Sequence, residues 1–129
     1  MNESLLIDAW NAYFKAIEEL RESFTKRDLM LLRNACEKGW LAIVKATDAL
    51  LEGKGLGRGE SYKERRDKLW RLSMENDLVN KLGLYDRFGA RESNLHIHGF
   101  YNGIIDWDIA KEELRKVEKC LRDVEEVLK

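Results

Sequence analysis

The chain has 129 residues, of which 44% are hydrophobic and 36% are charged, and its formal net charge is −1. This length predicts a single domain, residues 1–129, with a core that needs no disulfide or metal, and the near-neutral charge excludes nucleic-acid binding through bulk charge. No apolar run reaches the roughly 18–20 residues of a membrane span, and the start MNESLLID lacks the basic segment of a secretion signal. We therefore expect a cytoplasmic protein without membrane contact.

The first two expected helices cover about residues 4–24 and 29–52. In the first, apolar residues recur every three or four positions, which is the pattern of an amphipathic helix. Thr25 followed by Asp28 resembles a capping signal for the second helix. Gly39 interrupts that helix on its buried side, which predicts close approach of a neighbouring helix. The stripes of the two helices are Leu6, Trp10, Tyr13, Ile17, Leu20 and Phe24, and then Leu29, Leu32, Cys36, Ile43, Thr47 and Leu50.

A glycine-rich segment, EGKGLGRGES, separates these helices from the third. It lacks the preceding strand and the spacing of a phosphate-binding loop, so we interpret it as a flexible connector. Ser61 and Glu64 have the spacing of a capping box that opens a third helix at about 61–73. From residue 54 to residue 71 the chain carries seven cationic and three acidic side chains, a surplus of +4, which indicates either a solvated helix face or a modest anion-attracting edge.

Three more helical segments complete the fold. A short piece at about 74–81 precedes Gly83, a major helix from Leu84 ends near Gly99 or Gly103, and a last helix begins at about residue 106. No segment alternates with the period of a strand. The predicted fold is therefore all-α, an antiparallel bundle of four to five helices, with this core: Leu6, Tyr13, Ile17, Leu32, Ile43, Leu95, Leu114, Val117 and Leu121.

The chain has two cysteines, no proline and no glutamine, together with many Lys, Arg and Glu residues. This composition leans toward a thermophile. Cys36 and Cys120 lie within apolar stripes, so we interpret them as small core residues. A disulfide between them is the minor alternative, because intracellular disulfides do occur in hyperthermophiles.

The stretch RESNLHIHGF, residues 91–100, places Arg91 and both histidines, His96 and His98, on one expected helix. At about 100° per residue, Arg91 and His98 face nearly the same way, whereas Arg91 and His96 diverge by about 140°. A buried arginine needs a partner, so either this seam opens onto a cleft or subunit interface, or an internal carboxylate pairs with Arg91. A structural polar patch, a phosphate-handling site and a zinc site are the three interpretations; on a helix the two imidazoles point about 200° apart, which disfavours zinc. We find no cofactor motif.

At these residues the chain resembles the HEPN superfamily of small helical bundles, whose mark is an arginine followed after four to six residues by a histidine. Both Arg91-x4-His96 and Arg91-x6-His98 fit. ACEKGWLAIVKATDALL and SNLHIHGFY, within a similarity over most of residues 30–128, resemble the archaeal PaREP family, a HEPN-like group. The resemblance implies a homodimer in which Arg91 holds the scissile phosphate of RNA and His96 or His98 moves protons, without metal.

Two functions follow as expectations. The first is a HEPN-like homodimer that acts on RNA, by metal-independent phosphodiester cleavage or by binding alone. The second is a non-catalytic helical interaction module, which dimerises or pairs with a nucleotidyltransferase-type protein, as the resemblance implies. A groove lined by arginine and histidine with positive edges favours the first, and an exposed apolar patch with Arg91 bound to an internal carboxylate favours the second.

Overall fold

The computed structural model describes residues 2–129, which form six α-helices and one π-helix and contain no strand. The expected all-α class is confirmed. The helices are α1 (Asn2–Lys26), α2 (Leu29–Gly53), α3 (Tyr62–Glu75), α4 (Asp77–Leu82), α5 (Leu84–Arg91), the π-helix η1 (Glu92–Tyr101), and α6 (Trp107–Leu128). No helix between residues 2 and 129 combines the length and the apolar content that crossing a membrane requires.

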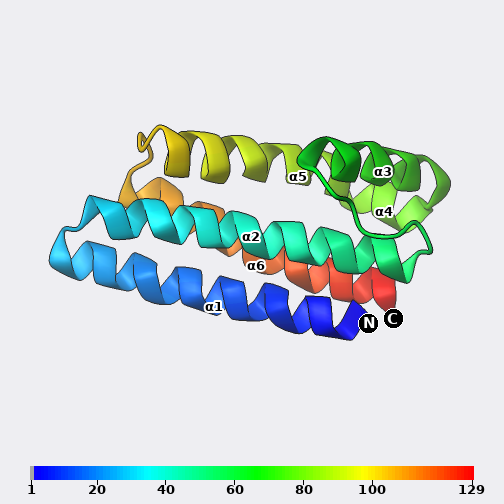
Figure 1. Ribbon diagram of the computed structural model, residues 1–129, viewed down its shortest axis with the longest axis horizontal. Coiled ribbons are helices and arrows are strands. Elements are labelled where there is room, and N and C mark those ends of the chain that lie inside the picture. Colours follow the sequence, from blue (N-terminus) through cyan, green and yellow to red (C-terminus); the bar gives the residue numbers. More distant parts are fainter. Residues whose placement is uncertain (1) are drawn as a thin grey trace.

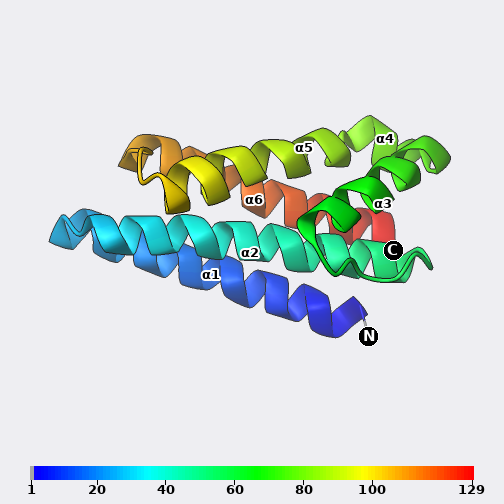
Figure 2. The same ribbon diagram turned by 45° about the horizontal axis from the view of Figure 1, so that its top comes forward.

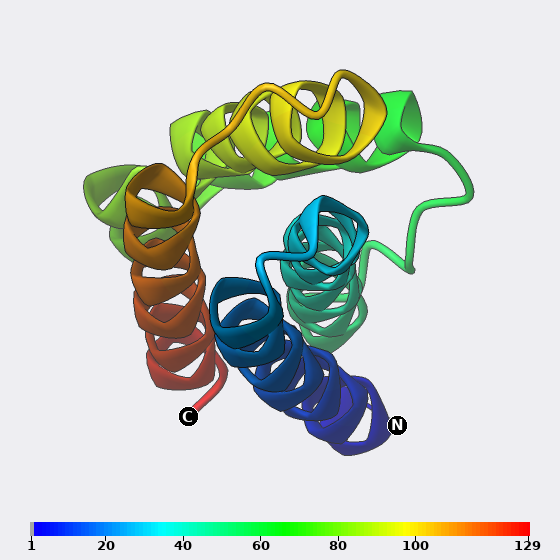
Figure 3. The same ribbon diagram turned by 90° about the vertical axis from the view of Figure 1, so that its left-hand side faces the viewer.

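Four long rods form an antiparallel bundle, and the end-on view in Figure 3 shows them around one core. α1 and α2 make a helical hairpin, α5 continues into η1 as one rod, and α6 returns beside α1 and α2, so that both termini lie at the same end (Figure 1). α3 and α4 join α2 to α5 and lie at the same end of the bundle as the two termini (Figure 2). This arrangement agrees with the expected bundle of four to five helices.

Side-chain caps explain where several helices begin. Asp28 accepts hydrogen bonds from the backbone N–H groups of Met30 and Leu31, and Ser61 accepts one from Glu64, which is the first of the two hydrogen bonds of the predicted capping box. The expected role of Thr25 was wrong, because α1 continues through Lys26 and Asp28 itself is the cap. A β-region Asp satisfies the orphan N–H groups without a second side chain.

Most of the predicted core is buried. Tyr13, Leu32, Ile43, Leu95, Leu114, Val117 and Leu121 lie in the core, as expected. Leu6 and Ile17 are only partly buried, because they lie at the edge between α1 and α6 rather than between α1 and α2. Gly39 confirms the predicted close approach, since a Cβ there would overlap the side chain of Leu114 on α6.

The two cysteines lie in the core, and the glycine-rich connector is held to α2 and α3 by hydrogen bonds. Cys36 and Cys120 are buried free thiols, as the main interpretation expected, and they form no disulfide. The connector is tied down: Gly59 N–H donates to the buried Asp48 carboxylate (3.1 Å), which also accepts two hydrogen bonds from Arg65 (2.9 and 3.0 Å). The connector therefore has a fixed path over α2.

Candidate functional site

The π-helix η1 determines how the stretch from Arg91 to Phe100 is displayed. Its hydrogen bonds reach five residues back, as between the Asn102 N–H and the Ile97 carbonyl (2.9 Å), so each turn holds more residues than an α-turn. The α-helical angle that paired Arg91 with His98 therefore does not apply. Arg91 is buried and His98 is exposed, so the expected shared face is wrong.

Arg91 is bound to an internal carboxylate. Its Nε donates a hydrogen bond to Oε1 of Glu113 on α6 at 2.8 Å, and the two side chains are 7% and 4% exposed. Lys116 approaches the other carboxylate oxygen at 3.6 Å. The pair satisfies the physical requirement for burying an arginine, and it confirms the alternative in which a carboxylate partners Arg91.

The Arg91 guanidinium keeps some capacity for another contact. Among residues 2–129, no protein group accepts a hydrogen bond from its two terminal nitrogens, and neither nitrogen is fully enclosed. Arg91 lines a shallow surface hollow of about 540 Å³ between α4, α5 and α6. The charged residues of this cationic hollow are Lys81, Arg87, Arg91, Lys116 and Lys119, with Asp86 and Asp123 as the acids.

His96 faces α2 instead. Its Nδ1 lies 2.7 Å from Oε1 of Glu37, and this carboxylate orients the ring so that Nδ1 carries a proton as the donor. Aromatic rings surround the imidazole at centroid distances of 4.9–6.4 Å, and its side chain is 13% exposed. The rings belong to Trp40, Tyr62, Phe100 and Tyr101. His96 is thus held by α2, α3 and η1 together.

The neighbouring carboxylate of Glu92 is also neutralised. Arg66 on α3 donates to Glu92 at 2.9 Å, and the Glu92 side chain is 17% exposed. Gly99 lets η1 approach α2, because a Cβ at this position would lie 2.8 Å from both Cβ and Sγ of Cys36. These contacts fix η1 against α2 and α3.

The three predicted site residues are therefore not assembled into one cleft. Arg91 binds a carboxylate on α6, His96 binds a carboxylate on α2, and His98 faces solvent; within residues 2–129 no hydrogen bond or ion pair joins any two of them. No group of three or more His, Cys, Asp or Glu side chains in the same range is placed to hold a metal ion.

Two important residues, Glu113 and Glu37, were missed from the sequence. Glu113 lies three residues after Ala110 and next to Leu114, so an acid inside the apolar stripe of the last helix was an available signal. Glu37 carried no comparable signal, because its neighbours on the helix include both charged and apolar residues.

Comparison with known proteins assigns the chain to no family. No family model matches the chain, and no curated protein matches it either. The similarity to HEPN-like and PaREP proteins therefore stays a resemblance, carried by Arg91, the two histidines and the segments quoted above.

Proposed function

We propose that this chain is a non-catalytic helical interaction module, whose partner is a second copy of itself or another protein. The observation that carries the proposal is the buried ion pair between Arg91 and Glu113. An arginine whose charge is neutralised by a buried carboxylate serves the packing of α5 on α6. Exposed apolar side chains along α1, such as Ile7 and Phe14, supply surface for a partner.

The separation of the side chains supports a non-catalytic role. Phosphodiester cleavage requires an acid or base within hydrogen-bond reach of the reacting atoms and a cation on the same phosphate. Arg91 is directed to α6, His96 to α2, and both contact carboxylates that compete with an anionic substrate.

The test is incubation of the purified protein with a mixed pool of short RNAs, in the presence of EDTA. We expect no cleavage above a buffer control. Cleavage that is lost in His96→Ala or His98→Ala, while thermal melts show a folded variant, would return the chain to the nuclease interpretation. Removal of a catalytic acid or base reduces the cleavage rate by about 10² to 10⁴, a difference that this assay can resolve.

RNA binding without cleavage is the second candidate, and the cationic hollow beside Arg91 favours it. Lys81 and Lys119 are exposed there, and the hollow carries five cationic and two acidic side chains. Phosphate contacts through such residues weaken steeply with salt. We would measure anisotropy of a labelled single-stranded RNA at low and physiological salt, comparing Lys81→Glu and Lys119→Glu with Lys54→Glu, an exposed control in the connector. Binding that only the first two variants weaken supports this candidate; equal loss in all three indicates bulk charge.

A further inference from the structure

Helix α1 carries two apolar stripes, and only one of them is used by the fold. The inner stripe is rich in small residues, which let α1 lie close to α2, and it is buried: Leu5, Ala9, Ala16, Leu20 and Ser23. The second stripe lies on the opposite flank, toward α6 and solvent. A surface helix needs one such stripe to join its own core, so the second requires an explanation.

The second stripe has the three-four spacing of a coiled-coil seam over almost three heptads. Ile7, Phe14 and Phe24 are 61%, 60% and 56% exposed, and Trp10 and Ile17 are partly buried. We name this set the outer seam: Ile7, Trp10, Phe14, Ile17, Arg21 and Phe24. Scattered exposed apolar residues are ordinary, but a continuous heptad seam along one helix marks a packing surface.

The groove between α1 and α6 runs beside the outer seam. Surface hollows follow it from Tyr13 to Trp107, the largest of about 660 Å³, with Ile17, Leu20 and Phe24 in its wall. Its α6 side is charged, with Lys111, Arg115 and Glu118 among the lining residues. An apolar wall with charged edges is the kind of surface that receives an amphipathic helix.

We propose that the outer seam receives α1 of a second copy of this chain, packed antiparallel across a two-fold axis that crosses the seam at the level of residues 15 and 16. This inference rests on the proposed interaction function, because it names the partner and the surface. In this register Ile7 lies opposite the partner's Phe24, and Phe14 lies opposite the partner's Ile17. Each pair is apolar, and each occurs twice, as an isologous interface requires.

The same register places Arg21 opposite the partner's Trp10, and here the charges are complementary. Arg21 is exposed and has no ion pair among residues 2–129. Glu125 accepts the Trp10 indole N–H at 3.0 Å and forms no ion pair in the same range, and Arg122 of the same chain lies over the Trp10 ring at 5.8 Å. An arginine and a carboxylate that each lack an ion pair within the described part of the chain are therefore brought together twice.

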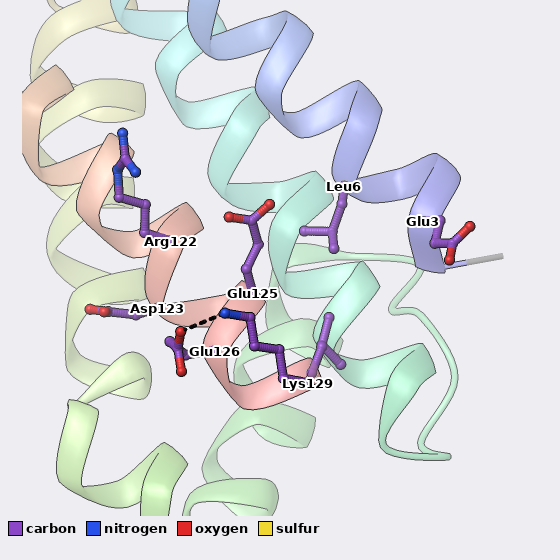
Figure 4. A pocket seen from close by; sticks show the side chains of 8 residues that line it. Glu3, Leu6, Arg122, Asp123, Glu125, Glu126 and Lys129 are labelled. Atoms are coloured by element: carbon purple, nitrogen blue, oxygen red, sulfur yellow. Dashed lines mark hydrogen bonds and ion pairs between the residues drawn. The ribbon is translucent and has the colours of Figure 1, made fainter.

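Charge at the ends of the seam agrees with this orientation. The last turn of α1 and the turn after it are basic, with Lys26 and Arg27 exposed. The first turn of α1 lies beside a hollow of about 610 Å³ at the end of α6, where four acids outnumber two cations (Figure 4). The acids are Glu3, Asp123, Glu125 and Glu126, and the cations are Arg122 and Lys129, which pairs with Glu126. Antiparallel packing places the basic end over the acidic hollow, whereas parallel packing aligns like charges.

The area is adequate for a specific dimer. The seam is roughly 26 Å long at 1.5 Å per residue. Its three exposed apolar side chains offer roughly 300–400 Å² per subunit, about half of the roughly 800 Å² that each partner buries in a typical interface. In the proposed dimer the charged residues that flank the groove, such as Lys111 and Arg115, would contribute the remainder.

The first test is the oligomeric state, measured by light scattering and analytical ultracentrifugation from 1 to 100 µM. We expect wild type to show twice the 15.1 kDa monomer mass at the upper end of the concentration range, and Phe14→Asp to stay monomeric and folded. Trp70→Asp is the matched control, since Trp70 on α3 is 52% exposed and lies outside the seam. A monomeric wild type, or a Phe14→Asp protein that dimerises as wild type does, overturns the proposal. Neither result changes the outcome of the RNA cleavage assay, so the two proposals fail separately.

The second test reads the register by disulfide cross-linking of single-cysteine additions. Ile7→Cys mixed with Phe24→Cys should cross-link under mild oxidation, and Ile7→Cys alone should not, because its two copies lie roughly 25 Å apart. Background is low, since the native Cys36 and Cys120 are buried. Efficient self-cross-linking of Ile7→Cys would show parallel packing and overturn the register.

Arg21→Glu should weaken the dimer about tenfold, and adding Glu125→Arg should restore its affinity. If affinity is not restored, the Arg21–Glu125 pairing is contradicted.

Discussion

The ion pair between Arg91 and Glu113 gives the sharpest test of whether Arg91 is structural. The perturbation is replacement of each partner by an apolar residue of similar volume, Arg91→Met and Glu113→Leu, alone and together. Because both side chains are less than 10% exposed, solvent compensates for only a small part of a lost partner, and each single change leaves one largely buried charge.

The two single variants should differ in how much stability they lose. Glu113→Leu leaves a buried guanidinium with no acid and should lower the free energy of unfolding by about 3–5 kcal/mol. Arg91→Met leaves a carboxylate that Lys116, 3.6 Å away, partly neutralises, so the loss should be smaller, about 2 kcal/mol. The double variant should be no less stable than Glu113→Leu, because apolar replacements of a buried pair can pack well.

The assay is urea unfolding followed by circular dichroism, at one protein concentration and ionic strength, so that any dimer contributes equally. Arg71→Met is the control, since Arg71 pairs with Glu75 on the exposed face of α3 and should leave the urea midpoint unchanged. A Glu113→Leu protein as stable as wild type would refute the structural reasoning. If, in addition, Arg91→Met lost RNA binding while remaining stable, Arg91 would be a ligand-binding residue.

Three further outcomes follow from the packing. Gly99→Ala should lower the free energy of unfolding by about 1–3 kcal/mol in urea titration, because the new methyl meets Cys36 at 2.8 Å. Gly89→Ala, also helical but with open space at its Cβ, should be neutral or stabilising by up to about 1 kcal/mol; the opposite order would show that η1 does not pack closely on α2. Burial raises the pKa of the Cys36 thiol from 9.0 to about 12, with Glu113 and Glu37 adding to the effect, and burial also raises the pKa of Cys120. The folded state holds these protons more tightly than the unfolded state does. The stability that the protonated thiols contribute should therefore be fully present below about pH 9 and should fall as the pH rises toward 12, which urea midpoints at pH 8, 9 and 10 can follow. Thiol titration at pH 8 should find both cysteines unreactive in the folded protein and reactive after unfolding; rapid reaction of the folded protein would contradict the burial.

The helical class and most of the core were readable from the sequence, for local reasons. Apolar residues such as Leu32 and Leu121 recur at helical spacing, and caps such as Ser61 act within one turn, so neither depends on distant parts of the chain. The predicted contact at Gly39 held for the same reason, since a glycine within a buried stripe indicates a close neighbour. The outer seam of α1 was also present in the spacing, but periodicity alone does not say which of two stripes a helix buries.

The arrangement of Arg91, His96 and His98 was decided only by tertiary structure. The sequence argument assumed α-helical geometry, and η1 instead adopts the wider π-helical turn, in which His98 reaches solvent while His96 meets Glu37. The carboxylate that partners Arg91 lies 22 residues away on another helix. Residue types and spacing along one helix determine which side chains are displayed, but the packing of α5 and η1 against α2 and α6 determines what each one meets, because those contacts join segments that the sequence keeps far apart.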